Sequence, residues 1–486
     1  MVTGRVAIGL VVASTGLVVT AGLLGPSVAQ PPLGPRRPHP PYSLFLEPSP
    51  WLVSGLVAAA LVLGAAAVGL GLHALRRGWS PDPRRLLAGG FIAVAVLMFV
   101  PPMGSADHLS YAAYGRIAVA GDDPYVEAPN LWRAGSDPVA GAVEAPWRWA
   151  PSVYGPVATA EQGLASLVGG SSLHTTVLFL MLLNGAAFLG TGLLLHRLLR
   201  GDRSRQVRAA LLWSLNPLLL YELVAGAHLD TVAVALGVAG LAVVRQRSAG
   251  AFAAGALVGS AVAVKLPLAL FGGALAWALR REPLRLVLLG LGAAAVLVPS
   301  YLAAGPHVFD QLRRAATYVS LATPWRLVLE PLTTGAGEDE GRRIITGLAM
   351  LVAVLLAALL LRALPVGPRG DRPDRPDLGA ARIACVLTVA WVLAAPYALP
   401  WYDALVWAPL ALLPASRLDA LLLARTLVLA LAYVPGRTIT LLPADLRELT
   451  LGFRADVAPW LVLALIVTVG VLAATRRLGS RPAPAP

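Results

Sequence analysis

A few polar side chains interrupt a very apolar chain at points where they could do chemistry. Asp107 and His108 directly follow the third hydrophobic run, and Asp123-Pro124-Tyr125 comes one helix-length later. A carboxylate held just above a membrane span is partly desolvated, and desolvation raises its pKa toward that of a useful general base. We therefore predict that Asp107 acts as a base, with capping of the following helix as the alternative. For Asp123-Pro124-Tyr125 the alternative is a simple turn.

Further polar residues follow at turns between later hydrophobic runs. Lys265 is the only lysine of the chain, and an ammonium at headgroup depth suits a phosphate, although it also fits a side chain that snorkels to the interface. His228 also allows a structural role, in which it bonds a backbone carbonyl. Asp230 allows one as the N-cap of the following helix. Trp401-Tyr402 equally fits an aromatic belt at the membrane interface.

The elements that position these residues must be membrane helices. The chain has 486 residues, of which 57% are hydrophobic and 13% charged, and its mean hydropathy is +0.71. A soluble protein could not bury so much apolar surface, so the bilayer must act as solvent. The single cysteine, Cys385, excludes an internal disulfide framework and a cysteine metal cluster.

The net charge of +13 follows from arginines that gather in short loops between hydrophobic runs. This distribution matches the positive-inside rule and argues against a nucleic-acid site. The first run, residues 5–26, resembles a signal peptide but is about twice the usual length, so we predict an uncleaved first span. The remaining long runs predict spans at 51–75, 86–103, 173–196, 284–304, 344–361, 383–400, 418–435 and 457–475.

Between these spans lie short apolar pairs, too short for full crossings, that must be tilted, re-entrant or shielded. We predict one all-α membrane domain over residues 1–486 with about 13 or 14 transmembrane or re-entrant helices. Residues 156–170 are weakly hydrophobic and predict a helix lying on the surface. Loop charges predict the remaining segments: outer segments at 104–156, 305–343 and 436–456, and a cytoplasmic linker at 362–382.

This topology puts the unexplained polar residues on the outer side, although no motif was used to orient the spans. The residues concerned come from the first outer loop, from the tips of the short pairs and from the second outer segment: Asp107, His108, Asp123, Tyr125, His228, Asp230, Lys265, Arg326, Trp401 and Tyr402. Their convergence predicts a functional site at the outer membrane face.

Several short patches resemble a known enzyme family. Asp107, Ser110-Tyr111, Gly115, Asp123-Pro124-Tyr125 and Tyr154-Gly155-Pro156 are similar to the first outer loop of GT-C glycosyltransferases, above all the actinobacterial polyprenol-phosphomannose-dependent α-1,6-mannosyltransferases of lipomannan and lipoarabinomannan synthesis. The patches NPLLLYELVAGAHLD, AVKLP and PWY, at 216–230, 263–267 and 400–402, add to the resemblance.

The resemblance implies a GT-C-like bundle in the cell membrane that transfers mannose from a polyprenyl-phosphate donor to a lipid-linked mannan or glycolipid, with inversion. Asp107 would be the catalytic base. Lys265, Arg326 and His228 would bind the donor phosphate. The substrate-binding set would be His108, Tyr111, Asp123, Tyr125, Asp230, Trp401 and Tyr402. No cofactor is required, although Asp122 and Asp123 suit Mg²⁺.

Two departures from the family pattern bear on the substrate. Leu229 stands where relatives often carry asparagine, and His108 follows Asp107 where an apolar residue is common. The alternatives are therefore a transferase of another polyprenyl-phosphate sugar, such as arabinofuranose or glucose, and a flippase for lipid-linked sugars. A non-catalytic scaffold is a further alternative. Transporters usually place charge at the midplane and show internal repeats, neither of which is apparent in this sequence.

Overall fold

The computed structural model describes residues 2–245, 247–364 and 376–479, and this part of the chain is helical. It contains no β-strand, and its one bridge is an isolated antiparallel pair between Ser416 and Gly479. The predicted all-α fold class is confirmed. Most of the predicted linker 362–382 lies outside the described residues.

The α-helices of the described part follow one another along the chain with short turns between most of them. Their bounds are α1 Val2–Leu24, α2 Pro50–Arg76, α3 Pro83–Leu97, α4 Asp107–Val119, α5 Pro156–Gly169, α6 Leu173–Leu198, α7 Arg203–Ala209, α8 Pro217–Leu219, α9 Asp230–Val243, α10 Arg247–Val264, α11 Ala269–Ala278, α12 Pro283–Ala304, α13 Asp310–Ala315, α14 Arg326–Ala336, α15 Glu338–Ala363, α16 Pro376–Ala394, α17 Ala404–Ala411, α18 Leu418–Tyr433, α19 Ala444–Gly452 and α20 Ala458–Ala474.

Seven helical segments of the described residues are long and apolar enough to cross a membrane: Val2–Leu24, Pro50–Arg76, Leu173–Leu198, Arg203–Ala225, Pro283–Ala304, Glu338–Ala363 and Ala444–Ala474. Four shorter apolar helices, of 10–17 residues, include α9 and α11. The chain is therefore a membrane protein. The predicted total of 13 or 14 crossings stays a prediction, because length and composition alone single out these seven.

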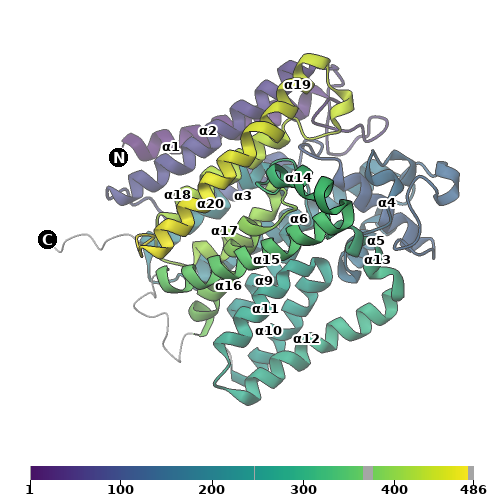
Figure 1. The fold of residues 1–486 in the computed structure, drawn as a ribbon. Helices are drawn as coiled ribbons and strands as arrows, with labels where there is room; N and C mark the ends of the chain where they lie inside the picture. Colours follow the sequence, from purple (N-terminus) through teal and green to yellow (C-terminus); the bar gives the residue numbers. More distant parts are fainter. Residues whose placement is uncertain (1, 246, 365–375, 480–486) are drawn as a thin grey trace.

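Neighbouring helices pack as hairpins around a common core. Helix α1 runs beside α2, and α10 packs against both α9 and α12. The start of α1 and the end of α20 lie at one end of the bundle, at the left of Figure 1, whereas α4, α5 and α13 gather at the opposite side. The segments that carry the predicted polar residues therefore meet at one end of the helices.

The segment Arg203–Ala225 is buried from Val207 onward although its helix is broken. Two π-helical stretches, Ala210–Ser214 and Leu220–Ala225, flank a break at Asn216. The Asn216 amide accepts the Leu218 N–H at 3.1 Å and donates to the Leu212 carbonyl at 3.1 Å. A break inside a membrane protein requires such replacements, because an unpaired buried backbone group is costly.

Two glycines let the outer segments approach one another closely. A Cβ on Gly115 would lie 2.1 Å from the Gln162 carbonyl oxygen, so only glycine allows α4 to contact α5 at this point. A Cβ on Gly155 would lie 2.2 Å from the carbonyl oxygen of Ala263, and the Gly155 N–H donates to the Val264 carbonyl at 3.3 Å. These contacts bring Tyr154 and the N-terminus of α5 to the turn that carries Lys265.

Two predicted surface segments differ in detail from the expectation. In α5, Gln162 is fully buried, whereas the side chains of Leu164 and Leu167 are exposed, so the polar groups face inward and the apolar face is outward. The third outer segment, 436–456, is not separate from the last span. Its second half is helical and continues into α20 as one segment, Ala444–Ala474.

Candidate active site

The candidate site forms where helix ends from distant parts of the chain meet. Asp107 is the first residue of α4, Asp230 is the first residue of α9, and Lys265 follows the last residue of α10. Trp401 and Tyr402 lie in a short 3-10 turn, Pro400–Asp403, before α17. Each chemical group therefore stands on a helix terminus, where the backbone around it is anchored by a packed helix.

Asp107 does not cap its helix. The N-cap position is Ala106, which makes no side-chain cap bond, and the Asp107 N–H instead donates to the Ser105 hydroxyl at 3.3 Å. The carboxylate points to Tyr111, whose hydroxyl donates to Oδ2 at 3.5 Å, and lies 3.9 Å from Nε2 of His228. The capping alternative from the sequence is therefore wrong, and the carboxylate is left for another role.

His228 is held from two sides. Its Nε2 lies 2.8 Å from the Ser105 hydroxyl, and its ring centroid is 3.8 Å from that of Trp401. Burial, together with the nearby Lys265 ammonium, holds the pKa of His228 well below its ordinary value, so the ring is neutral. A neutral, buried imidazole bonded to Ser105 fixes geometry and adds no positive charge.

Asp230 and Lys265 form an ion pair. Nζ of Lys265 donates to Oδ1 of Asp230 at 2.6 Å and stands 3.8 Å from the centroid of the Tyr402 ring. Leu229 is the N-cap residue of α9 and makes no side-chain cap bond, so the sequence alternative of Asp230 as an N-cap is wrong. Since the aromatic face adds a cation–π contact, the ammonium is held between a carboxylate and a ring.

Exposure separates the groups that can meet a substrate from those behind them. The side chain of Asp107 is 17% exposed and that of Lys265 is 14% exposed, whereas those of His228 and Asp230 are each 1% exposed. The accessible face of the site therefore carries one carboxyl group, one ammonium group and the edge of the half-buried Tyr402. His228 and Asp230 support this face from below.

The electrostatics of Asp107 suit a base. Burial raises the pKa of Asp107 from 3.8 to about 6, the Lys265 ammonium opposes that rise, and the Asp230 carboxylate adds to it. A carboxyl group with this pKa is mostly ionised at pH 7 and yet more basic than an exposed aspartate. The cluster thus holds a base and a cation side by side at a surface that a substrate can reach.

Aromatic side chains line the surroundings of the cluster. Tyr111 is buried and makes an edge-to-face contact with Tyr154 at 5.1 Å between ring centroids. Trp401 is 5% exposed and meets Tyr402 edge to face at 6.4 Å. Tyr111 and Trp401 therefore act through their neighbours, whereas Tyr402 is placed to contact a ligand directly.

Asp123 and Tyr125 lie in a different place, the wall of a groove of about 840 Å³ between α4, α5 and α12. Asp123 accepts the Tyr125 N–H at 2.8 Å, and the Tyr125 hydroxyl bonds the Thr159 hydroxyl at 2.7 Å. The turn predicted as the structural alternative is therefore present. Asp107 is not among the residues that line this groove, and no hydrogen bond between described residues joins the two places, so the structure does not bring Asp123 and Tyr125 into the Asp107 cluster.

Arg326 also stands apart from the cluster. It is the first residue of α14, and the electrostatic surroundings of Asp107 and Lys265 do not include it. The preceding Trp325 anchors this segment by donating to the Ala394 carbonyl at 2.7 Å. The structure thus does not bring Arg326 to the surface that carries Lys265, where the sequence-based hypothesis placed it.

His108 is fully buried, and within the described structure neither ring nitrogen has a hydrogen-bond partner. Burial, assisted by the charge of Arg437, lowers the pKa of His108 to about 3, so the ring is neutral. Arg437 pairs with Glu144 and donates to the Ser27 carbonyl, which ties three outer segments together. The structure therefore places His108 in the interior beneath this tie and not on the accessible face.

Sequence reasoning missed Ser105, the residue that joins Asp107 to His228. Its hydroxyl contacts both, and it is 4% exposed. The signal was available, since a serine two residues before a helix start often bonds the backbone there. Tyr397 was also missed; it stacks edge to face on Tyr402 at 6.4 Å between centroids.

The two acidic residues considered for Mg²⁺ already have protein partners. Asp122 accepts the indole N–H of Trp132 at 2.8 Å, and Asp123 accepts a backbone N–H as described. Within the described ranges, no group of three or more His, Cys, Asp or Glu side chains is arranged to hold a metal ion. The residues at Asp107 combine a carboxyl group with a nearby ammonium group, a set that suits proton transfer.

Comparison with known proteins places most of this cluster in one family region. A family profile described as "Alpha-(1->6)-mannopyranosyltransferase, N-terminal domain" matches residues 4–281, which include Asp107, His228, Asp230 and Lys265. Arg326, Trp401 and Tyr402 lie beyond the matched residues.

Individual relatives agree with the profile. A "Probable alpha-(1->6)-mannopyranosyltransferase" of Mycolicibacterium smegmatis is 29% identical over 47% of this chain and 38% of its own length. An "Alpha-(1->6)-mannopyranosyltransferase A" of Mycobacterium tuberculosis is 28% identical over 47% of this chain and 44% of its own length. An "Alpha-(1->6)-mannopyranosyltransferase B" of Corynebacterium glutamicum is 28% identical over 30% of this chain and 25% of its own length. The chain thus matches less than half the length of these curated relatives.

Among solved structures, an archaeal oligosaccharyltransferase of Archaeoglobus fulgidus, in complex with an inhibitory peptide and a dolichol-phosphate, covers 83% of this chain and 56% of its own. Its TM-score is 0.38 at 14% identity, which is too low to carry an argument. The family profile covers more than half of the chain and contains Asp107, Lys265, His228 and Asp230. The chain therefore belongs to the alpha-(1→6)-mannopyranosyltransferase family.

Proposed function

We propose that this protein is a multi-pass membrane glycosyltransferase that moves mannose from polyprenyl-phosphate mannose to a lipid-linked mannan or glycolipid at the outer membrane face. One observation carries the proposal: Asp107 and Lys265 share the accessible face of a cluster that lies within the family region. The arginine-rich loops support the outward orientation, since they place the opposite helix ends in the cytoplasm.

In the proposed reaction, Asp107 takes the proton from an acceptor hydroxyl as that oxygen attacks C1 of the donor mannose. The bond between C1 and the phosphate oxygen breaks, and its electron pair stays on the leaving polyprenyl phosphate. Attack from the face opposite the phosphate inverts the configuration at C1, so a β-linked donor gives an α-linked product.

Lys265 stabilises the leaving phosphate. Negative charge develops there in the transition state, and a cation fixed beforehand lowers the barrier because it needs no reorganisation. Its ion pair with Asp230 and its contact with Tyr402 hold the ammonium in place before the donor binds. Proton transfer and charge stabilisation are thus assigned to two side chains of this chain, and no metal is needed for either role.

The groove of Asp123 and Tyr125 is assigned to sugar units of the acceptor that are remote from the reacting hydroxyl, because Asp107 is not among its lining residues. Its wall combines the ring of Tyr125, two carboxylates and the hydroxyl groups of Thr159 and Ser300, which is a mixture that suits sugar rings and their hydroxyl groups. His228 is assigned a secondary role, in positioning Asp107 through Ser105.

The test is a transfer assay on membranes that contain the full chain, with radiolabelled polyprenyl-phosphate mannose and a short α-1,6-mannoside. Asp107→Asn is expected to lower transfer by about 10²- to 10⁴-fold, the usual contribution of a general base. Asp310→Asn, which removes an exposed carboxylate from another outer segment, is the matched control. Undiminished transfer by Asp107→Asn would remove Asp107 as the base.

Parallel arms with polyprenyl-phosphate glucose and polyprenyl-phosphate arabinofuranose decide the donor sugar. Transfer from one of these alone would replace mannose while keeping the reaction class. Movement of the lipid-linked donor across the bilayer without glycosidic bond formation would identify a flippase instead.

A further inference from the structure

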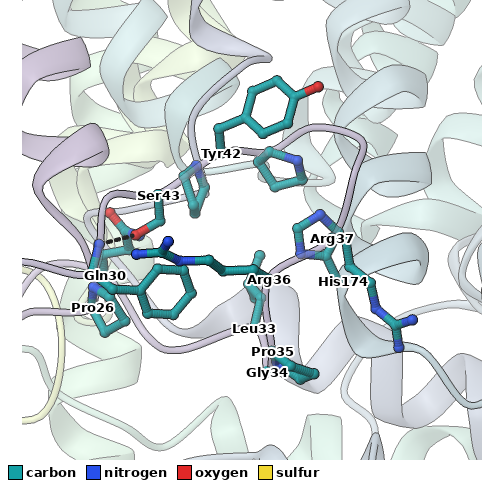
Figure 2. A pocket seen from close by; sticks show the side chains of 13 residues that line it. Pro26, Gln30, Leu33, Gly34, Pro35, Arg36, Arg37, Tyr42, Ser43 and His174 are labelled. Carbon is teal, nitrogen blue, oxygen red and sulfur yellow. Dashed lines mark hydrogen bonds between the residues drawn. The ribbon is translucent and has the colours of Figure 1, made fainter.

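A second cavity, whose lining does not include Asp107, lies in the loop that joins α1 to α2. It has a volume of about 100 Å³ and begins where the chain leaves the end of α1. Figure 2 shows the side chains around it, which belong to the loop itself and to two neighbours, Pro101 and His174. No carboxylate is among the lining residues: Pro26, Gln30, Leu33, Gly34, Pro35, Arg36, Arg37, Pro41, Tyr42, Ser43, Phe45, Pro101 and His174.

The cavity carries two adjacent arginines. The Arg36 side chain crosses the opening, where it donates to the Leu44 carbonyl at 3.0 Å and lies 5.1 Å from the Phe45 ring centroid. The Arg37 side chain extends on the His174 side in Figure 2. The structure gives the Arg37 guanidinium no hydrogen bond or ion pair with any described residue, so its donors are available.

These arginines also run against the charge rule of the chain. In the proposed orientation the loop is extracytoplasmic, where arginine is disfavoured, whereas the other short arginine-rich loops lie on the cytoplasmic side. A pair of cations at this position, of which Arg37 has no hydrogen bond or ion pair with a described residue, suits a ligand of opposite charge.

A buried acceptor on the wall lacks a partner. Gln30 is 1% exposed, and its side-chain carbonyl oxygen has no hydrogen-bond partner within the described structure. Buried polar atoms are nearly always paired, so this oxygen indicates a donor group that the cavity receives. Arginines and an orphan acceptor together fit an anion that also carries hydroxyl groups.

The surroundings of the cavity are those of a membrane interface. The loop begins after α1 and ends at α2, so it lies where these helices leave the apolar region. Leu44, Leu46 and Phe99 are 54%, 60% and 53% exposed. Such a set of exposed apolar side chains beside a cationic cavity suits a molecule with a polar head and hydrocarbon chains.

We propose that this cavity binds the headgroup of an anionic lipid, with the phosphodiester at Arg36 and Arg37 and a headgroup hydroxyl donating to Gln30. The acyl chains lie along the exposed apolar side chains of the same loop. The Gly104 N–H donates to the Ala29 carbonyl at 2.9 Å, so the loop is bonded to the segment that leads to Asp107. A bound lipid therefore steadies the entry to the candidate active site without contacting it.

The test uses the full chain in detergent and measures binding of short-chain phosphatidylinositol, phosphatidylglycerol and phosphatidylcholine, and of inorganic phosphate, by thermal shift and by microscale thermophoresis. Phosphatidylinositol and phosphatidylglycerol are expected to bind saturably, the inositol lipid more tightly because of its hydroxyl groups. Phosphatidylcholine and inorganic phosphate are expected to bind at least about tenfold more weakly, because the former is neutral overall and the latter lacks chains.

Arg37→Gln is the first variant, because Arg37 makes no bond that folding depends on, and it is expected to weaken binding of the anionic lipids about tenfold. Arg84→Gln/Arg85→Gln removes two adjacent arginines elsewhere and is expected to leave binding unchanged. Gln30→Leu is expected to remove the preference for the inositol lipid. Equal binding of phosphatidylcholine, equal binding of inorganic phosphate, or full affinity in Arg37→Gln would each overturn the proposal.

Discussion

Replacing Asp230 by asparagine changes the electrostatics of Asp107 without altering the accessible face of the site. The Asp230 side chain is 1% exposed, and asparagine keeps an acceptor for the Lys265 ammonium while removing the negative charge. That charge is one of the causes that raise the pKa of Asp107 to about 6, and the Lys265 ammonium opposes them. The pKa of Asp107 is therefore expected to fall in Asp230→Asn.

The direction of the effect on activity follows from the role of a base. Asp107 works when ionised, so kcat/KM rises with pH through its pKa and levels off above it. With a pKa of about 6, roughly one Asp107 in eleven is ionised at pH 5. A fall of one unit, worth about 1.4 kcal/mol of electrostatic interaction, leaves about half ionised, so kcat/KM at pH 5 rises about fivefold relative to its plateau.

The measurement is the acidic limb of kcat/KM between about pH 4.5 and pH 8, with wild type and Asp230→Asn in the same membranes. Asp310→Asn again serves as the matched carboxylate-to-amide control and should keep the wild-type limb. A limb that stays in place, or moves to higher pH, in Asp230→Asn would refute the assignment of Asp230 as the residue that raises the pKa of Asp107.

Three further substitutions test neighbouring parts of the site. Lys265→Met is expected to lower kcat by about 10²- to 10³-fold, because the transition state loses a charge partner. It should also move the acidic limb of the kcat/KM profile to higher pH, because the ammonium lowers the pKa of Asp107. An unchanged kcat would contradict this role of Lys265. Tyr111→Phe removes the hydroxyl that bonds Asp107 and should also move the limb upward, with little change at pH 8. Asp403→Ala leaves the buried Arg425 uncompensated and should lower the free energy of unfolding by about 3–5 kcal/mol in denaturant titrations; Asp403→Ala/Arg425→Leu should recover most of the loss.

Asp403 lies in the turn that carries Tyr402. The side chains of Asp403 and Arg425 are each 1% exposed and form an ion pair, and the Thr426 hydroxyl donates to Asp403 at 2.6 Å. This network fixes the 3-10 turn on α18. Stability and the Tyr402 contact to Lys265 are therefore expected to change together.

Much of the fold could be predicted because the bilayer imposes strong rules on sequence. Long apolar runs must be helices, so the long helices followed from the chain alone, and the arginine-rich loops gave the proposal that the polar residues face outward. The broken segment Arg203–Ala225 was less predictable. Its π-helical stretches depend on side-chain partners such as Asn216, which only packing supplies.

The sequence by itself singled out Asp107, His228, Asp230 and Lys265 as candidate site residues, although it also allowed each a purely structural role. Only the tertiary structure decided which of them are accessible to a ligand and which support the others, because it brings together helix ends that are far apart in the chain. It pairs Lys265 with Asp230, leaves Asp107 and Lys265 accessible, and buries His228 against Ser105. Solvent access and ion pairing depend on distances across the fold, which local sequence patterns do not encode.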